Sequence, residues 1–259
     1  MNMKIGLLNT RNDKINQNGG IRKDGNDNAK LIADHIEKND YTFLGTQELT
    51  YKISKRIQNF LSNYKLYGKY RLGSFLKKTI INENNAVITK CKVIDKKTYH
   101  LPFIPLNFHD FIKALKKPCI MPRIIQVVII EDEYPICIIN THIDYYIESL
   151  QKRQLNKIYK IVEKYSKKYD TFLMGDFNLQ KTDDLFISFV DRLKELNMKR
   201  VPIDTKTNAS KYSEKSAIDH LFIPNDYLVK EFGTLKHHDE TLEDVTDHTG
   251  LYAIVEKNK

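Results

Sequence analysis

Short polar clusters stand where apolar runs of the sequence end, and together they hold the residue types that bind a metal ion and hydrolyse a phosphate ester. They comprise Asn9, Glu48, His142 with Asp144, Asp176 with Asn178, and Asp247 with His248. A polar residue after a strand is usually a turn or helix-cap residue, so each cluster alone indicates little. The set as a whole combines oxygen ligands, which suit Mg²⁺ or Mn²⁺, with histidines, which suit acid–base work and phosphate contact. The sequence contains no GxSxG or P-loop motif, so the pattern favours metal-assisted attack by water.

Asp219 differs from these residues because it lies inside an apolar run, between Ile218 and Leu221-Phe222-Ile223. A carboxylate on the buried face of a strand is costly unless it is paired, and a histidine from another strand is a natural partner. Such a pair fixes the tautomer of the imidazole and stabilises its protonated form, which makes it a competent general base for water. The alternative is an Asp on the exposed face of the strand, or one bonded to nearby backbone.

The apolar runs predict the elements that must position these residues. Strands are expected over 4–9, 41–45, 85–89, 92–98, 171–175, 216–223 and 249–256, and residues 123–130 and 135–141 form a predicted hairpin. Helical spacing of apolar residues predicts helices over 28–38, 53–61, 150–165 and 183–196. This mixture predicts a single domain over residues 1–259, an α/β (α+β) sandwich of two mixed sheets with helices on the outer faces. Residues 99–122 are expected to form a long surface loop.

The composition narrows the class of protein. The chain has 259 residues, of which 41% are apolar, and no run approaches the ~18–20 apolar residues of a membrane-spanning helix, so no stable membrane insertion is expected. The N-terminal residues lack a small-residue cleavage site and are interpreted as a strand rather than a signal peptide. Cys91, Cys119 and Cys137 are widely spaced, which argues against a disulfide framework or a zinc site and favours the cytoplasm.

The charge balance favours a polyanionic partner. The formal net charge is +9, from 42 Lys and Arg against 33 Asp and Glu, although general enrichment in Lys and Asn could give the same total. Residues 65–78 interleave basic and aromatic side chains, which suits nucleic acid. The basic residues of the helix 150–168 are expected to be its solvated side, so the segment 99–122, with Lys113, Lys116 and Lys117, is the better substrate candidate. The apolar residues of that segment could instead face lipid or a partner: Phe103, Ile104, Leu106, Phe108 and Phe111.

In their order, these clusters resemble the motifs of the endonuclease/exonuclease/phosphatase superfamily, which includes deoxyribonuclease I, exonuclease III, neutral sphingomyelinases and inositol polyphosphate 5-phosphatases. The resemblance runs from Lys4 to Val255. Its motifs are Leu8-Asn9-Thr10-Arg11, Gln47-Glu48, Asn85-Ala86-Val87-Ile88, Thr141-His142-Ile143-Asp144, Gly175-Asp176-Phe177-Asn178, Ile218-Asp219-His220 and Thr246-Asp247-His248. Each motif is short, but all of them in the family's order form a specific pattern. The resemblance implies a four-layer α/β-β/α sandwich of the deoxyribonuclease I type, with the site at one end of the sheets.

The resemblance also implies a metal ion and the residues that surround it. Glu48 would bind the catalytic Mg²⁺, for which Mn²⁺ is an alternative, and Asn9 and Asp247 would assist. Asp176 and Asn178 would orient the attacking water and contact the scissile phosphate.

The same resemblance implies the groups that move protons and contact the substrate. His248, paired with Asp219, would be the general base or the phosphate-activating group. His142 would contact the phosphate and assist the leaving group. The expected substrate-binding residues are Arg11, Asn85 and Arg123. An Arg at the start of a strand is otherwise usually a solvated residue.

Two departures from the family narrow the choice of branch. Abasic-site endonucleases of the exonuclease III type carry an acidic residue where this chain has Arg11, and they usually lack a residue like His142. Both differences favour the deoxyribonuclease I and sphingomyelinase branches. The sequence therefore predicts a cytoplasmic, monomeric, Mg²⁺-dependent phosphodiesterase or endonuclease acting on nucleic acid, with DNA as the expected substrate. The alternatives are a phosphatase or sphingomyelinase-type phospholipase and, less favoured because every expected catalytic position is filled, an inactive binding module.

Overall fold

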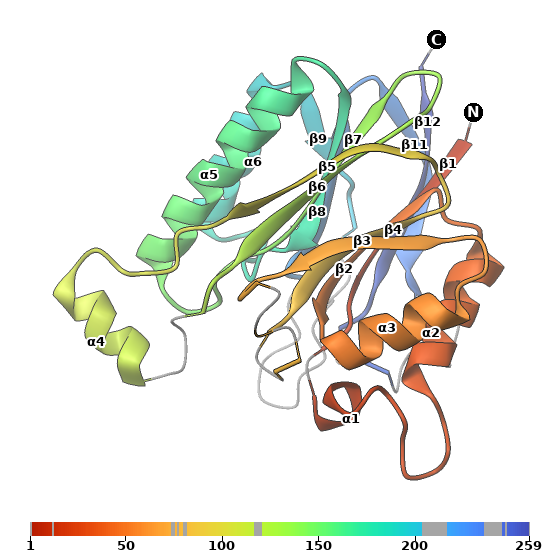
Figure 1. Cartoon of the computed structure of the whole chain (residues 1–259). Coiled ribbons are helices and arrows are strands. Elements are labelled where there is room, and N and C mark those ends of the chain that lie inside the picture. Colours follow the sequence, from red (N-terminus) through yellow and green to blue (C-terminus); the bar gives the residue numbers. More distant parts are fainter. Residues whose placement is uncertain are drawn as a thin grey trace.

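Two mixed β-sheets of six strands each pack face to face, and helices cover both outer faces (Figure 1). The computed structural model describes residues 2–11, 13–73, 76, 78–79, 82–116, 121–203, 217–235, 245–246 and 248–258. The predicted four-layer α/β-β/α sandwich of the deoxyribonuclease I type is confirmed. Helices are interspersed among the strands along the chain, and both sheets contain parallel and antiparallel pairs.

The first sheet has the strand order β11-β12-β1-β2-β4-β3. Its strands are β1 (Asn2–Asn9), β2 (Phe43–Leu49), β3 (Lys65–Tyr70), β4 (Asn84–Thr89), β11 (Tyr227–Thr234) and β12 (Leu251–Lys257). The central strands β1 and β2 run parallel, and their register places Asn9 opposite Gln47. The carboxyl ends of parallel strands meet at the same edge of a sheet, so Asn9 and the neighbouring Glu48 come together there.

The second sheet has the strand order β5-β6-β7-β8-β10-β9. Its strands are β5 (Val93–His100), β6 (Ile124–Ile130), β7 (Ile136–His142), β8 (Asp170–Asp176), β9 (Met198–Arg200) and β10 (Asp219–Pro224). In the parallel pair β7 and β8, His142 stands opposite Asp176. In the antiparallel pair β8 and β10, Asp176 stands opposite Asp219. The hydrogen-bond register alone therefore lines up three polar residues in one row.

Four helices cover the sheets. The helices α2 (Asn28–Asn39) and α3 (Tyr51–Phe60) lie on the first sheet, whereas α5 (Glu148–Ser166) and α6 (Asp184–Glu195) lie on the second (Figure 1). The buried side of α5 repeats apolar residues at helical spacing, and its lysines are on the solvated side, as expected. Two shorter helices, α1 (Lys14–Gln17) and α4 (Phe108–Lys116), lie outside these layers.

The core between the sheets is apolar and aromatic. Phe43 of the first sheet packs edge-on against Phe172 of the second, with ring centroids 5.4 Å apart. Toward the site the interface becomes polar. There Asn140 Nδ2 donates to the carbonyl oxygens of Thr46 (2.9 Å) and Ala86 (2.8 Å) of the opposite sheet. These bonds satisfy buried polar groups and fix the two sheets relative to each other where the site begins.

The prediction of a long surface loop over 99–122 is wrong in its middle and at its start. Tyr99 belongs to β5, and the Tyr99 hydroxyl lies 3.0 Å from that of Tyr165 on α5. Residues 108–116 form α4, in which Ala114 packs into a small cluster with Ile147 and Leu150. The helical period was hidden because α4 leaves most of its large apolar residues exposed. Lys117 and Cys119 lie outside the described residues.

Three strands were not predicted from the sequence: β3, β9 and β11. Cys91 and Cys137 are free thiols. Among the described helices, none combines the length and the apolar character that a membrane crossing requires.

Candidate active site

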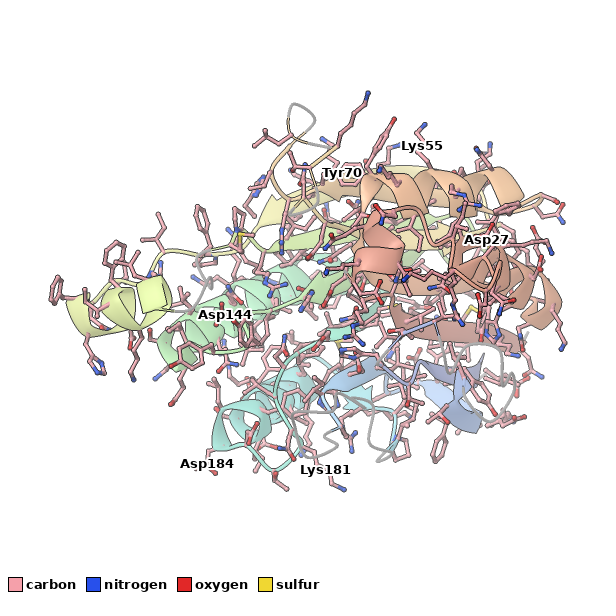
Figure 2. The ribbon with its side chains drawn as sticks, turned by 90° about the horizontal axis from the view of Figure 1, so that it is seen from below. Asp27, Lys55, Tyr70, Asp144, Lys181 and Asp184 are labelled. Carbon is pink, nitrogen blue, oxygen red and sulfur yellow. The ribbon has the colours of Figure 1, made fainter. Side chains whose placement is uncertain are left out.

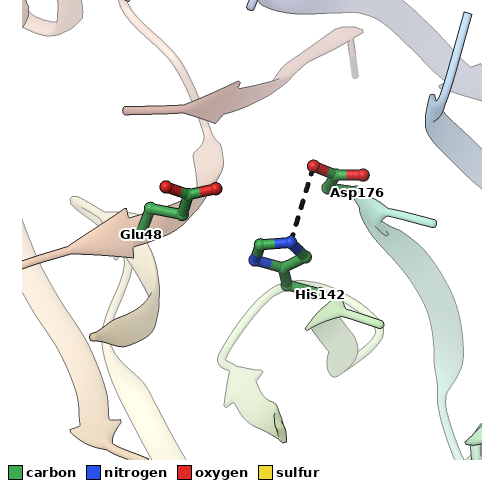
Figure 3. A group of neighbouring side chains, drawn as sticks. All are labelled: Glu48, His142 and Asp176. Atoms are coloured by element: carbon green, nitrogen blue, oxygen red, sulfur yellow. Dashed lines mark ion pairs between the residues drawn. The ribbon is translucent and has the colours of Figure 1, made fainter. Parts of the chain in front are cut away.

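Residues from the strand ends of both sheets converge at one end of the sandwich. This is the end opposite the start of β1, and Figure 2 looks onto it, with Tyr70 of β3 on one side and Lys181 and Asp184 on the other. Glu48, at the end of β2, faces His142 and Asp176, which end β7 and β8 (Figure 3). The two sheets thus contribute opposite walls of one polar site.

Asn9 joins the two walls. Its buried side-chain Nδ2 donates to Glu48 Oε1 at 3.1 Å and to Asp176 Oδ2 at 3.0 Å. Its Oδ1 accepts from the backbone N–H of Arg11 at 3.0 Å. A single amide therefore holds two carboxylates from different sheets close together, which is the arrangement expected of a residue that positions metal ligands.

The backbone is left-handed at three of the predicted site residues. Arg11, Glu48 and Asn178 have φ angles of 53°, 58° and 47°. A non-glycine residue in this region costs of order 1–3 kcal/mol, and such residues cluster at functional sites. The register between β2 and β4 also shifts between Thr46 and Leu49, so the regular ladder is interrupted around Glu48.

The predicted Gly175–Asn178 segment ends β8 and forms part of the wall that the second sheet contributes. A Cβ at Gly175 would lie 2.3 Å from the carbonyl oxygen of Thr141, so only glycine lets β8 approach β7 this closely. Asp176 Oδ1 then accepts from the backbone N–H of Asn178 at 2.9 Å, and Asn178 Nδ2 donates to the carbonyl of Ile143 at 3.1 Å. The turn thereby fixes the carboxylate and places the Asn178 side chain beside β7.

Asp219 and His248 form a buried pair, as the apolar surroundings of Asp219 predicted. His248 Nδ1 lies 2.8 Å from Asp219 Oδ2, and both side chains are less than a tenth exposed. His248 Nε2 points toward Asp176, 3.8 Å from its Oδ2. Burial by itself lowers the pKa of His248, but the carboxylates of Asp219, Asp176 and Glu48 together raise it to about 10. In the metal-free protein, His248 is therefore charged at neutral pH.

Asp176 lies at the centre of the site. Burial raises its pKa, and the nearby charge of Asp219 raises it further, while His248 and the Asn178 N–H oppose the shift; the pKa is about 7. Neighbouring carboxylates repel one another, and a bound cation would relieve this repulsion.

His142 has the opposite electrostatic environment. It is buried, and Arg123 Nη1 lies 3.0 Å from its Nδ1 and 3.1 Å from its Nε2. Burial, followed by the charges of Arg123 and Arg71, lowers the pKa of His142 well below its ordinary value. The neutral His142 can donate a hydrogen bond to a phosphate oxygen but holds no extra proton for a leaving group. This favours the phosphate-contact half of its predicted role.

The site contains one further charged residue that the motifs did not indicate, Arg71. It follows β3 directly, is 7% exposed, and its Nη1 pairs with Glu83 Oε2 at 2.8 Å. Burial lowers the pKa of Arg71, as does the charge of Arg123, while Glu83 and Glu48 oppose the shift. From the sequence, Arg71 was assigned to the basic and aromatic segment 65–78, because β3 was not predicted there. Had residues 65–70 been paired with 84–89 as a hairpin, Arg71 and Glu83 would have stood at its site end.

Three residues of the family-like motifs have contacts that position other parts of the fold. Asp144 Oδ1 accepts from the backbone N–H groups of Tyr146 (2.8 Å) and Ile147 (2.7 Å) and so closes the turn that leads into α5. His220 stacks on Phe186 with ring centroids 4.1 Å apart. Asn85 Nδ2 donates to the carbonyl of Ile124 in the other sheet at 2.9 Å, so at least this half of its amide ties the sheets together rather than contacting substrate.

The donor set fits a divalent cation. Within the described residues, potential ligand atoms of Glu48, His142 and Asp176 lie within 4.8 Å of one another, as do those of Asp176, Asp219 and His248. Mg²⁺ and Mn²⁺ bind clustered carboxylate oxygens whose negative charge is not fully neutralised by nearby positive groups. Asp247, the third predicted ligand, lies outside the described residues.

Comparisons with known proteins agree with the fold. The family model described as the endonuclease/exonuclease/phosphatase family matches residues 8–248. No curated protein sequence matches the chain. Solved structures share its fold at low sequence identity. A mannosyl-6-phosphatase of Bacteroides thetaiotaomicron has a TM-score of 0.75 at 19% identity, over 98% of this chain and 99% of that one.

Two more solved structures are similar over nearly their whole length. A protein of unknown function from Enterococcus faecalis has a TM-score of 0.74 at 17% identity, covering 99% of this chain and 100% of that one. TDP2 of D. rerio, complexed with a single-strand DNA product, has a TM-score of 0.71 at 12% identity, covering 99% of each chain. Since the family model spans most of the sequence, the chain belongs to the endonuclease/exonuclease/phosphatase family, whose members are phosphoesterases.

Proposed function

We propose that the chain is a Mg²⁺-dependent phosphodiesterase that cleaves nucleic acid, with DNA as the first substrate to test, by attack of water on phosphorus. Residues 1–259 act as one domain and as a cytoplasmic monomer in this proposal. The observation that carries it is the convergence of Glu48, Asp176 and the Asp219–His248 pair, from two sheets, on one buried polar site.

Glu48 is the main candidate metal ligand, with Asp176 facing it and Asn9 and Asp247 assisting. A divalent ion there would neutralise the negative charge that develops on the phosphate and on the departing oxygen. Its charge would also relieve the repulsion between Asp176 and the neighbouring carboxylates. Mn²⁺, with the same preference for oxygen ligands, is the expected substitute.

His248 is the candidate base or phosphate-activating group. Its Nδ1 is held by Asp219, which leaves Nε2 directed toward Asp176. The charged form donates to a phosphate oxygen, whereas the neutral form accepts a proton from water. A cation between Glu48 and Asp176 would cancel part of the negative charge that keeps His248 protonated. The metal-loaded site would therefore have more of the neutral, base-competent form.

Positive and neutral donors complete the phosphate site. Arg123 and Arg71 supply fixed charge, and neutral His142 supplies a hydrogen-bond donor. Preorganised donors of this kind stabilise the charge of the transition state because they need not reorient during the reaction. Asp176 and Asn178 are the candidates for orienting the water. Arg11 is exposed at the rim, where it could meet a longer substrate.

Two of the similar structures mark the range of substrates to test. One is called a mannosyl-6-phosphatase and the other was solved with a single-strand DNA product. The test is a substrate panel: plasmid, single-stranded DNA, RNA, sphingomyelin and sugar phosphates, each with Mg²⁺ and with EDTA. Mg²⁺-dependent cleavage of a nucleic acid supports the proposal. If nucleic acid stays intact under every metal condition while a phosphate monoester is hydrolysed, the proposed function changes from nuclease to phosphatase.

A second candidate function, hydrolysis of a lipid phosphoester, is favoured by one observation. Leu106, two residues before α4, and Phe108, its first residue, are each 80% exposed, and Leu115 is 59% exposed. Figure 1 shows that α4 projects from the body of the sandwich. An exposed apolar patch of this kind is common where a protein meets lipid or a partner. If lipid is the substrate, Leu106→Ser with Phe108→Ser will abolish turnover of sphingomyelin in vesicles and leave turnover of a soluble phosphodiester unchanged.

A further inference from the structure

A groove of about 250 Å³ opens between the edge strands of the two sheets, β3 and β5. Both strands lie at the ends of their sheets, so the groove runs along the side of the sandwich rather than across its active-site end. Residues of both strands and of β6 line it: Leu66, Tyr67, Gly68, Lys69, Lys96, Thr98 and Gln126.

The side chains that face the groove follow from strand alternation. Tyr67 packs against the core between the sheets, so Lys65 and Lys69, two residues away on either side, share its face of β3. On β5, Lys96 Nζ lies over the Tyr67 ring, 5.2 Å from its centroid. Thr98 Oγ1 donates to Gln126 Oε1 at 2.8 Å, which places Thr98 on the same inner face.

The groove is positively charged without internal compensation. Lys69 and Lys96 line the groove and are exposed, as is Lys65, which lies beyond the groove on the same face of β3. None of the three forms an ion pair with a carboxylate in the part of the chain that the structure describes. Asp95 is close in sequence, and its carboxylate accepts from the backbone N–H of Lys96 at 2.7 Å, but it does not line the groove. At the other end of β5, by contrast, Lys92 pairs with Glu131 at 2.8 Å. Like charges on facing walls repel, and an anion between them relieves the repulsion.

Both walls of the groove lead to the active site. Along β3, the row Lys65, Tyr67, Lys69 continues to Arg71, which pairs with Glu83 at the site. Along β5, His100 stands opposite Ile124, the neighbour of Arg123. Six residues of extended chain separate Lys65 from Arg71, or about 20 Å at ~3.3 Å per residue. That length accommodates several nucleotides of an extended strand.

We propose that this groove binds the phosphate chain of a single-stranded nucleic acid and guides it to Arg71 and Arg123. The inference rests on the proposed function and specifies its substrate as a strand that extends past the scissile phosphate. The occupant follows from the charge: a chain of phosphates neutralises lysines on both walls of the groove. A single phosphate monoester would leave most of the lysines unused.

Binding is measured by fluorescence anisotropy of a fluorescein-labelled oligothymidylate of about twenty nucleotides, in EDTA, across a salt series. The test variant is Lys69→Gln with Lys96→Gln. The matched control is Lys157→Gln with Lys160→Gln, which removes the same charge from two exposed lysines of α5. We expect the groove variant to bind about 10-fold more weakly and its salt slope to fall by roughly 1.4, since each single-strand phosphate contact contributes ~0.7. The control should retain the wild-type affinity and slope.

The inference is overturned if the wild type does not bind the oligonucleotide, if the groove variant binds like the wild type, or if both variants weaken binding equally. Kinetics supply a second readout. The groove variant should lose kcat/KM on the oligonucleotide but keep it on bis(p-nitrophenyl) phosphate, a small diester that cannot reach the groove. If the wild type binds the oligonucleotide through the groove but cleaves only phosphate monoesters, the groove is supported and the proposed nuclease activity fails.

Discussion

His248 Nδ1 lies 2.8 Å from Asp219 Oδ2, although Asp219 begins β10 of the second sheet and His248 lies 29 positions later, just before β12 of the first. This contact orients the imidazole so that Nε2 is left for chemistry. It also pairs a buried carboxylate. The apolar residues around Asp219 in the sequence predicted such a partner, because an unpaired buried carboxylate is costly.

The first prediction concerns this pair. Asp219→Asn keeps the shape of the side chain but removes its charge, so the pKa of His248 should fall from about 10. We expect kcat to fall by roughly 10²–10⁴-fold, the range for a disabled acid–base group. NMR titration of the metal-free protein measures the pKa, and steady-state kinetics measure kcat. Asp144→Asn is the matched control, because Asp144 is an equally buried carboxylate whose side chain only closes the turn before α5. An unchanged pKa of His248 in Asp219→Asn would contradict the assigned role.

The second prediction concerns metal binding, read without activity. Mg²⁺ should raise the melting temperature of the wild type, because a ligand at 100 times its Kd stabilises the folded state by ~2.7 kcal/mol. For a chain of this size that is a shift of several degrees. Glu48→Gln should lose most of the shift, whereas Glu163→Gln on the outer surface of α5 should retain it. An equal Mg²⁺ shift in Glu48→Gln and the wild type would remove Glu48 from the metal site.

The third prediction separates the chemical and structural roles of Arg71. Arg71→Gln should lower kcat/KM for a phosphodiester by on the order of 10²-fold, the usual loss when one preorganised donor is removed. Glu83→Gln removes the 2.8 Å partner but keeps the guanidinium charge, so it should cost stability more than turnover. Denaturant unfolding gives the stability of each variant. If both variants lose the same turnover, Arg71 acts only through its pairing with Glu83.

The fourth prediction concerns the close approach of β7 and β8. Gly175→Ala places a Cβ 2.3 Å from the Thr141 carbonyl oxygen, so the strands must separate. We expect a loss of about 1–3 kcal/mol in the free energy of unfolding, typical of an overpacked site. Activity should fall as well, since Asp176 is the next residue. A variant with unchanged stability and kcat would show that the strand spacing does not position Asp176.

Much of this site could be predicted from the sequence because its residues occupy strand ends. Asn9 and Glu48 lie at the carboxyl ends of two neighbouring parallel strands, and so do His142 and Asp176. The topology of each sheet therefore brings each pair together. What could not be predicted was the contact between the sheets, for example the bond from Asn9 to Asp176, since it depends on packing rather than on a local pattern.

The missed elements share a physical cause. β3 alternates exposed lysines with half-buried aromatic residues, and an edge strand of this kind lacks the apolar run that marks a buried strand. α4 buries Ala114 but leaves Phe108 and Leu115 exposed, so its apolar residues do not mark a buried face. Arg71 was overlooked for the first of these reasons. Its role became visible only when β3 was placed beside β4.

The most direct measurement of the central claim is the initial rate of phosphodiester hydrolysis by the wild type and by His248→Ala, each with Mg²⁺ and with EDTA. Bis(p-nitrophenyl) phosphate and an oligothymidylate serve as the small and the polymeric diester. The proposed site predicts hydrolysis by the wild type with Mg²⁺, and none above background in EDTA or in His248→Ala. Hydrolysis that persists in EDTA, or that His248→Ala retains at the wild-type rate, would contradict it.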